Sequence, residues 1–512
     1  MTRRPLRGPA ALALTWALAS TPAAAQLPAA DLDAYVPRAM QQWEVPGLAL
    51  AVVKDDSVVY LRGFGVRTLG RPEPVDPHTL FASASTTKAF TATALALLVD
   101  EGKVRWDDPV VKHLPEFQLA DPYLTRELTV RDLLAHRSAL PTADLLWYGS
   151  ANDARAILRR LRHLRPTAGL RGRYAYNNNL YAVAGLVVEA ASGMPWDAFV
   201  RRRILEPLEM RETATGYAGL LTRINVASPH LEVDDTLRVI PYRNLDNIAP
   251  AGAMNSSAAE MARWVRFQLD SARVSGRRLV SDSAWRETMT PQFVIPASSY
   301  YPAARLARPN FTAYGLGWFL QDYRGRKVAL HTGSIDGMSA LTALLPEERL
   351  GVVVLANLDH AELRHALMYR VFDLYLGGAP RDWSAELRAL YGRLAEQGQA
   401  RERAREARRV RGTRPTLPLR YYVGTYADSA YGELVVRLEE GKLVAEFGPG
   451  FSGELEHWHY DTFRARWADR ALDPWHLTFT QGTDGRINGV AVESVGEFRR
   501  LPPRPPTATA SP

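Results

Sequence analysis

The stretch Phe81-Ala82-Ser83-Ala84-Ser85-Thr86-Thr87-Lys88-Ala89-Phe90 carries most of the information in this chain. The run that follows, to Leu98, is rich in Ala, Leu and Thr and contains no Gly or Pro, so we predict a helix that starts close to Ser85. Lys88 then lies one turn further along the same helix face. A buried lysine has a lowered pKa and can act as the base that a serine nucleophile needs. A helix-capping serine followed by a solvated lysine would show the same spacing.

The composition of the chain is that of a globular protein, with 512 residues, 46% hydrophobic and 23% charged. The length allows two or three domains. Zero cysteines exclude disulfides and a cysteine nucleophile. The net charge of +8 comes largely from an arginine-rich run at 401–411, which alternates with glutamates and alanines and lacks aromatic residues. We therefore expect a solvated helix or linker there and no nucleic-acid partner.

The N-terminus has the pattern of a secretory signal peptide. Arginines at positions 3, 4 and 7 precede an apolar segment at 10–19 and the run Ala23-Ala24-Ala25. We predict that residues 1–25 are removed by cleavage after Ala25. The apolar segment is too short to span a bilayer, so we expect a periplasmic or secreted protein with no stable membrane span. Both the general and the twin-arginine export routes stay open.

Strand-like segments occur at both ends of the first 380 residues, around a helix-rich middle. Apolar runs at 48–53 and 58–61 predict two strands joined by a tight turn, and the segment 327–356 predicts three more. We expect an α/β fold, with an antiparallel sheet that is flanked by helices and whose first and last strands pair, plus a helical lobe. This first domain would span 26–380.

The character of the chain changes after residue 380. A helical, arginine-rich linker is expected at 381–418, followed by many short strands that predict a small all-β barrel at 419–502. The barrel could bind a ligand of its own. The tail at 503–512 is rich in Pro, Thr and Ala, which predicts disorder. His457 and His459 alternate along one strand but lack a third ligand, so we expect no metal and no cofactor.

A second group of candidate residues is Tyr176 and Asn178, just before a predicted helix at 180–191. A phenol and an amide two residues apart can point into one site. Tyr176 could shuttle protons if Lys88 lowers its pKa, and Asn178 could hold a substrate carbonyl or the lysine. An asparagine-rich turn is the simpler explanation of this segment.

A third group is His331-Thr332-Gly333-Ser334, at the end of a predicted strand. We expect all four residues to bind substrate, because Gly333 would let a substrate backbone approach and the strand edge could pair with it. The backbone N–H groups of Ser334 and Ser85 could form an oxyanion hole. An ordinary strand-to-turn transition would also fit this sequence.

Together and in this order, the three groups resemble the motifs of the serine β-lactamase and penicillin-binding-protein superfamily. The tyrosine in the second group is similar to the class C branch, which includes D-alanyl-D-alanine carboxypeptidases, D-aminopeptidases and family VIII esterases. The resemblance covers most of 32–378, and the C-terminal region resembles a lipocalin-like domain. It implies a β-lactamase/transpeptidase-like fold and a serine hydrolase that forms an acyl-enzyme on Ser85, with Lys88 and Tyr176 sharing the proton transfers.

His331 departs from this pattern, because many β-lactamases carry a lysine at its position. A histidine is mostly neutral at pH 7, so a fixed cation for a substrate carboxylate is missing. The departure favours an ester, an amide or a D-amino-acid peptide over a β-lactam as the small-molecule or peptide substrate. A sensor or binding protein that keeps the fold without turnover is the alternative.

Overall fold

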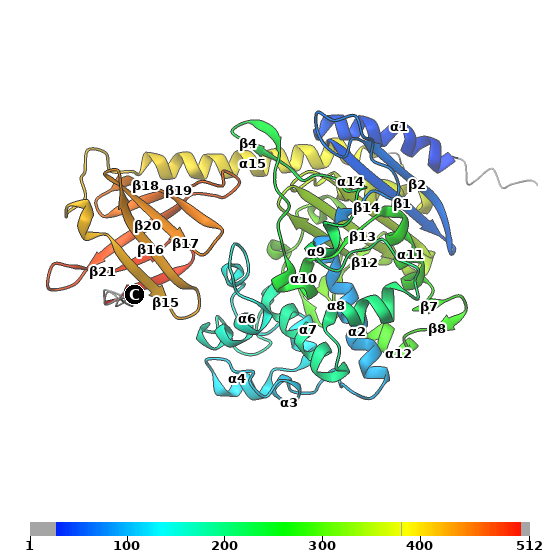
Figure 1. Cartoon of the computed structure of the whole chain (residues 1–512). Helices are drawn as coiled ribbons and strands as arrows, with labels where there is room; N and C mark the ends of the chain where they lie inside the picture. The colour runs from blue at the N-terminus through cyan, green and yellow to red at the C-terminus, as the bar shows by residue number, and fades with distance from the viewer. Residues whose placement is uncertain (1–26, 380, 503–512) are drawn as a thin grey trace, which may run out of the picture.

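The computed structural model describes residues 27–379 and 381–502. The predicted signal peptide and the predicted disordered tail lie outside the described residues. Figure 1 shows a large α/β domain on the right and a smaller barrel on the left, joined across the top by the long helix α15 (Trp383–Ala407). Among the described residues, no helix combines the length and apolarity needed to cross a bilayer.

The α/β domain is built on an eight-stranded antiparallel sheet. The strand β1 (Gly47–Lys54), near the start of the domain, pairs with β14 (Leu350–Ala356), near its end, and Leu48 lies opposite Ala356. This confirms the predicted pairing of the first and last strands. The strand order in the sheet is β2 (Ser57–Gly65), β1, β14, β13 (Met338–Leu345), β12 (Arg326–Ile335), β11 (Phe319–Tyr323), β10 (Thr312–Tyr314) and β9 (Phe293–Val294).

Helices cover both faces of this sheet, which explains why β13 and β14 are buried along their whole length. Side chains alternate between the two faces of a strand. In β1, Leu48 and Leu50 therefore join the core under α14 (Leu363–Leu376), whereas Ala49 and Ala51 join the core on the opposite face. The second core includes α11 (Ala258–Leu269) and the helical lobe.

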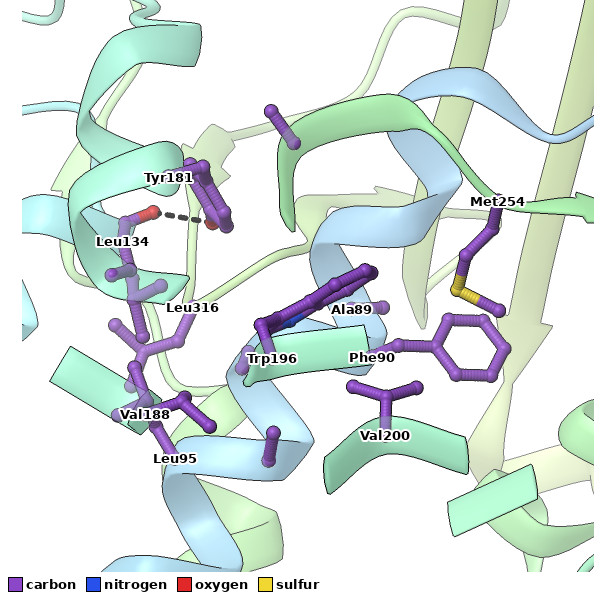
Figure 2. Close-up of a cluster of buried hydrophobic side chains, with 14 of the residues drawn as sticks. Ala89, Phe90, Leu95, Leu134, Tyr181, Val188, Trp196, Val200, Met254 and Leu316 are labelled. Atoms are coloured by element: carbon purple, nitrogen blue, oxygen red, sulfur yellow. Dashed lines mark hydrogen bonds between the residues drawn. The ribbon is translucent and has the colours of Figure 1, made fainter. Parts of the chain in front are cut away.

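The helical lobe surrounds α2 (Thr87–Asp100), whose side chains are buried from Thr87 to Leu98. Figure 2 shows apolar side chains of α2, including Phe90, beside Trp196 and Val200 of α8 (Trp196–Val200). The same view shows the Tyr181 hydroxyl donating a hydrogen bond to the carbonyl oxygen of Leu134 at 2.8 Å. Packing on all sides therefore fixes the position of α2.

The remaining elements of the first domain are the long, largely buried helix α7 and a set of shorter or peripheral helices and strand pairs. The helices are α1 (Leu27–Gln42), α3 (Val110–His113), α4 (Pro122–Glu127), α5 (Val130–Leu134), α6 (Ala154–Arg160), α7 (Asn178–Ser192), α9 (Tyr217–Leu220), α10 (Ala249–Gly252), α12 (Asp282–Thr288) and α13 (Ala304–Ala307). Three strand pairs are β3 (Phe81–Ala82) with β6 (Asn255–Ser256), β4 (His230–Val233) with β5 (Thr236–Val239), and β7 (Arg273–Val274) with β8 (Arg277–Arg278).

The C-terminal domain is a closed antiparallel barrel of eight strands, which confirms the predicted all-β barrel. The barrel closes where Tyr426 pairs with Arg500. Its buried aromatic and aliphatic side chains form one apolar core, so these side chains occupy its interior. The strands are β15 (Gly424–Asp428), β16 (Gly432–Glu439), β17 (Lys442–Phe447), β18 (Phe451–His459), β19 (Thr462–Trp467), β20 (Trp475–Gln481), β21 (Ile487–Val492) and β22 (Gly496–Arg500).

The arginine-rich run anchors the barrel to α15. The Arg409 guanidinium donates to the carbonyl oxygens of Trp458 at 2.8 Å and His457 at 3.0 Å. The histidines considered as a metal pair are engaged with the backbone: His457 contacts the Tyr460 oxygen, and His459 accepts from the Val410 N–H.

The barrel also touches the first domain directly. The Gly450 N–H donates to the Gly149 carbonyl oxygen at 3.0 Å, and Arg243 bridges Asp336 of the first domain and Asp469 of the barrel. Asp336 lies in the turn between β12 and β13, next to the third candidate group. The barrel is therefore held from two sides, by α15 and by loops beside the candidate site.

Candidate active site

Ser85 lies in a short 3-10 turn (Ala84–Thr86) that leads into α2. Ala84, just before it, has a φ of 44°, in the left-handed region that residues other than glycine rarely adopt. The backbone of Ser83 is pressed against β12, since a Cβ at Gly333 would lie 2.2 Å from the Ser83 carbonyl oxygen. The turn is thus held in an unusual conformation that presents the partly exposed Ser85.

Lys88 is fully buried, and three oxygen atoms surround its amine. Its Nζ lies 2.9 Å from Ser85 Oγ, 2.8 Å from Asn178 Oδ1 and 2.9 Å from the Ala251 carbonyl oxygen. Burial lowers the pKa of Lys88 well below its usual value, and the charge of Asp144 opposes this effect. A neutral amine has two hydrogens and one lone pair. In that neutral form the two hydrogens go to the oxygens of Asn178 and Ala251, and the lone pair can accept from the Ser85 hydroxyl.

Tyr176 lies beside the same serine and lysine. Burial raises the pKa of its phenol well above the usual value, although a hydrogen bond with Ser85 opposes the rise. The condition that Lys88 lowers the pKa of Tyr176 is not met, because the loss of solvent dominates. The ring packs 4.1 Å from the ring of buried His136 and 4.9 Å from Lys88 Nζ. Tyr176 is thus a protonated hydroxyl beside Ser85.

The three consecutive asparagines tie the start of α7 to the loop at 141–144. Asn177 caps the helix by accepting from the Leu180 N–H, and its amide donates to the Pro141 carbonyl oxygen at 2.7 Å. Asn179 donates to the carbonyl oxygens of Thr142 and Ala143. Asn178, between them, accepts from Lys88 and donates to Asp144 Oδ1 at 3.1 Å.

Asp144 is a site residue that the sequence analysis missed. Its Oδ1 accepts from Trp147 Nε1 at 2.7 Å as well as from Asn178. Burial raises the pKa of this carboxyl group, against the opposing effects of those two hydrogen bonds and of Lys88. The sequence offers no clear signal for it, since an aspartate in a Pro-Thr-Ala-Asp loop is ordinary and only the fold brings it to Asn178.

The side chain of His331 is not placed to bind substrate, which corrects our expectation. It is 1% exposed, and both ring nitrogens are engaged: Nδ1–H donates to the Thr332 carbonyl oxygen at 2.7 Å, and the Tyr314 hydroxyl donates to Nε2 at 2.9 Å. Burial lowers its pKa to about 3, with a contribution from Lys88. His331 is therefore neutral and supports Tyr176, whose ring lies 6.4 Å away. The Thr332 hydroxyl is likewise turned inward and donates to the Tyr301 hydroxyl.

Gly333 serves a different purpose from the one expected. It lets β12 pack against Ser83, whereas we expected it to admit a substrate backbone. Its carbonyl oxygen and the Ser334 Oγ both accept from buried Arg364, at 2.6 and 2.8 Å. Arg364, which the sequence analysis also missed, is paired with Glu362 and holds this end of the strand.

The outer edge of β12 is open near Ser85. The strand pairs with β11 only from Arg326 to Leu330, so the positions from His331 to Ile335 extend beyond that partner. β12 also contacts the serine turn (Ala84–Thr86). Backbone groups on such an edge can pair with an extended substrate.

The fold and the Ser–Lys pair define a serine hydrolase of the type that β-lactamases and penicillin-binding proteins represent. The Beta-lactamase family model matches residues 32–375, and a domain of unknown function (DUF3471) matches residues 408–501, which include the barrel. The chain therefore belongs to the β-lactamase and penicillin-binding-protein-like family of hydrolases.

Several known proteins are similar to much of this chain. The chain is 30% identical over 448 residues to an unguisins hydrolase of Aspergillus violaceofuscus, an alignment that covers 81% of this chain and 78% of that protein. It is 26% identical over 337 residues to protein flp of Staphylococcus aureus, covering 64% and 63%. The octameric penicillin-binding protein homologue from Pyrococcus abyssi superposes with a TM-score of 0.62 at 22% identity, covering 92% of this chain and 99% of that one. This structure shows the shared fold.

Proposed function

We propose that this protein hydrolyses amide or ester bonds through an acyl-enzyme on Ser85. The observation that carries the proposal is the buried Lys88, whose amine is within 2.9 Å of Ser85 Oγ and whose pKa burial holds low. A neutral amine at that distance can take the proton of the hydroxyl as oxygen attacks a carbonyl carbon.

Each residue then has a defined part in the reaction. Ser85 Oγ bonds to the substrate carbonyl carbon while its proton moves to Lys88 Nζ. When the tetrahedral intermediate collapses, the bond to the leaving group breaks and Tyr176 gives that group a proton; Lys88 returns one to Tyr176. Water then attacks the acyl-Ser85 ester with Lys88 as base, which releases the acid and restores the hydroxyl.

Backbone N–H groups would stabilise the oxyanion. Ser85 stands in the first turn of a helical segment, where N–H groups lack helical partners and the helix dipole favours negative charge. The exposed edge of β12 would supply the second donor at Ser334.

Peptides are the substrate class we propose. The neutral, buried His331 offers no cation for a β-lactam carboxylate, and the open edge of β12 suits an extended chain. One relative is named a hydrolase of unguisins, and the structure of another protein of this fold, SurE, was solved with D-Leu at 22% identity and a TM-score of 0.53. The name of the first relative supports a peptide or amide substrate.

Labelling with a fluorophosphonate tests the proposal. The wild type should gain the mass of one phosphonyl group at Ser85, and Ser85→Ala should gain none. Ser83→Ala is the matched control, because Ser83 is a buried serine two residues away and should leave labelling intact. Equal labelling of the wild type and Ser85→Ala would refute the assignment. Short-chain esters, D-aminoacyl amides, D-Ala-D-Ala peptides and a chromogenic cephalosporin would then rank the substrates.

A further inference from the structure

One carboxylate oxygen of Asp144, Oδ2, accepts no hydrogen bond from the described residues. Oδ1 accepts from Trp147 and Asn178, whereas within the described ranges no group donates to Oδ2 and no Lys, Arg or His forms an ion pair with this carboxylate. The side chain is only partly exposed, so water compensates the charge incompletely. A carboxylate in this state gains most from a cationic hydrogen-bond donor.

The position of Asp144 puts this carboxylate between the catalytic residues and the barrel. Its charge acts on Lys88 and Tyr176, and also on Tyr431 of the barrel, whose pKa is raised by burial first and then by Asp428 and Asp144. The neighbouring Leu145 packs against the barrel core. Asp144 is therefore linked to Lys88 through Asn178, and its neighbour Leu145 contacts the barrel.

We propose that Asp144 binds a protonated primary amine on the acyl side of the substrate and so selects peptides that carry one. This inference rests on the proposed function, because it places the amine near the carbonyl carbon that Ser85 attacks. Lys88 does not donate a hydrogen bond to Asp144, because its amine donates to Asn178 Oδ1 and to the Ala251 carbonyl oxygen.

Two sources could supply the amine, and both share one chemistry. A free α-amino group lies two bonds from the attacked carbon, as in a substrate cleaved after its first residue. A basic side chain of the same residue, such as lysine or ornithine, carries its ammonium at the end of a flexible stem. Neutral N-acylated residues without a basic side chain would lack the contact.

Three phosphonate probes separate these sources. Diphenyl 1-aminoethylphosphonate carries a free α-amine, its N-acetyl derivative carries none, and the N-acetyl phosphonate analogue of lysine carries only the side-chain amine. We expect the wild type to label at Ser85 about 10- to 100-fold faster with one amine probe than with the neutral probe, the range of a charge-assisted hydrogen bond. The faster amine probe identifies the source.

The readout is the ratio of the rates with amine and neutral probes. In Asp144→Asn the ratio should fall to within about threefold of unity, even if altered support of Asn178 slows all probes. Asp336→Asn is the matched control: its carboxylate is at the β12–β13 turn and is already paired with Arg243, so the wild-type ratio should persist. An equal rate for all probes in the wild type would overturn the inference, as would an Asp144→Asn ratio that stays at the wild-type value. Failure of every probe to label the wild type would instead refute the proposed function.

Discussion

Replacing Gly333 by alanine tests whether β12 positions the nucleophile. A Cβ at this position would lie 2.2 Å from the Ser83 carbonyl oxygen and 3.0 Å from the Ala84 Cβ. Relieving the clash requires the strand and the serine turn to separate by about 1 Å, since non-bonded atoms approach to about 3.4 Å at the closest. A displacement of that size can slow a positioned reaction by about 100-fold.

The assay is the second-order rate at which a fluorophosphonate labels Ser85, measured by mass spectrometry on protein whose folded fraction is known. Gly333→Ala should label about 100-fold more slowly and should lose about 1–3 kcal/mol of stability from overpacking. Its substrate-binding edge remains, so competition by substrate should weaken less than the rate does.

Gly63→Ala separates the two effects. A Cβ at Gly63 would lie 2.3 Å from the Val75 carbonyl oxygen, a clash of the same kind, but β2 is four strands away from β12. Neighbouring strands lie about 4.8 Å apart, so the distance is about 19 Å. This variant should lose stability and keep the wild-type rate once folded. If Gly333→Ala also kept that rate, the positioning role of β12 would be refuted.

Five further outcomes are expected, four from the site and its surroundings and one from the N-terminal sequence. Because burial lowers the pKa of Lys88, the labelling rate should rise with pH through that lowered pKa and then level off. Between the lowered pKa of Lys88 and about 10.4, the unfolded chain binds a proton at Lys88 that the native state does not. The free energy of unfolding should therefore increase with pH in this range, by at most ~1.4 kcal/mol per pH unit. Lys88→Met should remove this increase, as measured by denaturant titration at several pH values. Tyr176→Phe should reduce turnover by about 100- to 10,000-fold while circular dichroism stays unchanged, and near-normal turnover would exclude the tyrosine as proton carrier. Deleting 419–512 should lower labelling, because the loops beside the site lose their contacts with the barrel; an unchanged rate would show that the barrel is dispensable for acylation. Export should release a chain that begins at Gln26, and N-terminal sequencing of the secreted protein would detect any other start.

Local contacts of the site were predictable from the sequence. Ser85 and Lys88 are three residues apart on one helical segment, and helix geometry alone brings their side chains together. The strands at both ends of the first domain were also predictable from short apolar runs and tight turns. These features depend on residues that are near in sequence or on periodicity.

Features set by burial or by distant segments were not predictable. The pKa of Tyr176 rises because the folded protein removes water from it, which no spacing reveals. Position 333 must be glycine because the Ser83 carbonyl oxygen leaves no room for a Cβ atom. Asp144 reaches Asn178 because three asparagines hold the loop that carries it. We expected His331 to bind substrate because it belongs to the group at 331–334 at the end of a strand, yet its side chain points into the core.

The pairing of β1 with β14 has a consequence for how the chain acquires its structure. Leu48 cannot pair with Ala356 until nearly the whole first domain has been synthesised. At 5–20 residues per second, synthesis of the roughly 300 intervening residues takes about 15–60 s. The pairing of β1 with β14, the second and third strands of the sheet order, must wait for the end of this domain, and contacts so distant in sequence form slowly. During that interval β1 is paired only with β2 and its apolar edge lacks β14, which makes this stage of folding prone to aggregation.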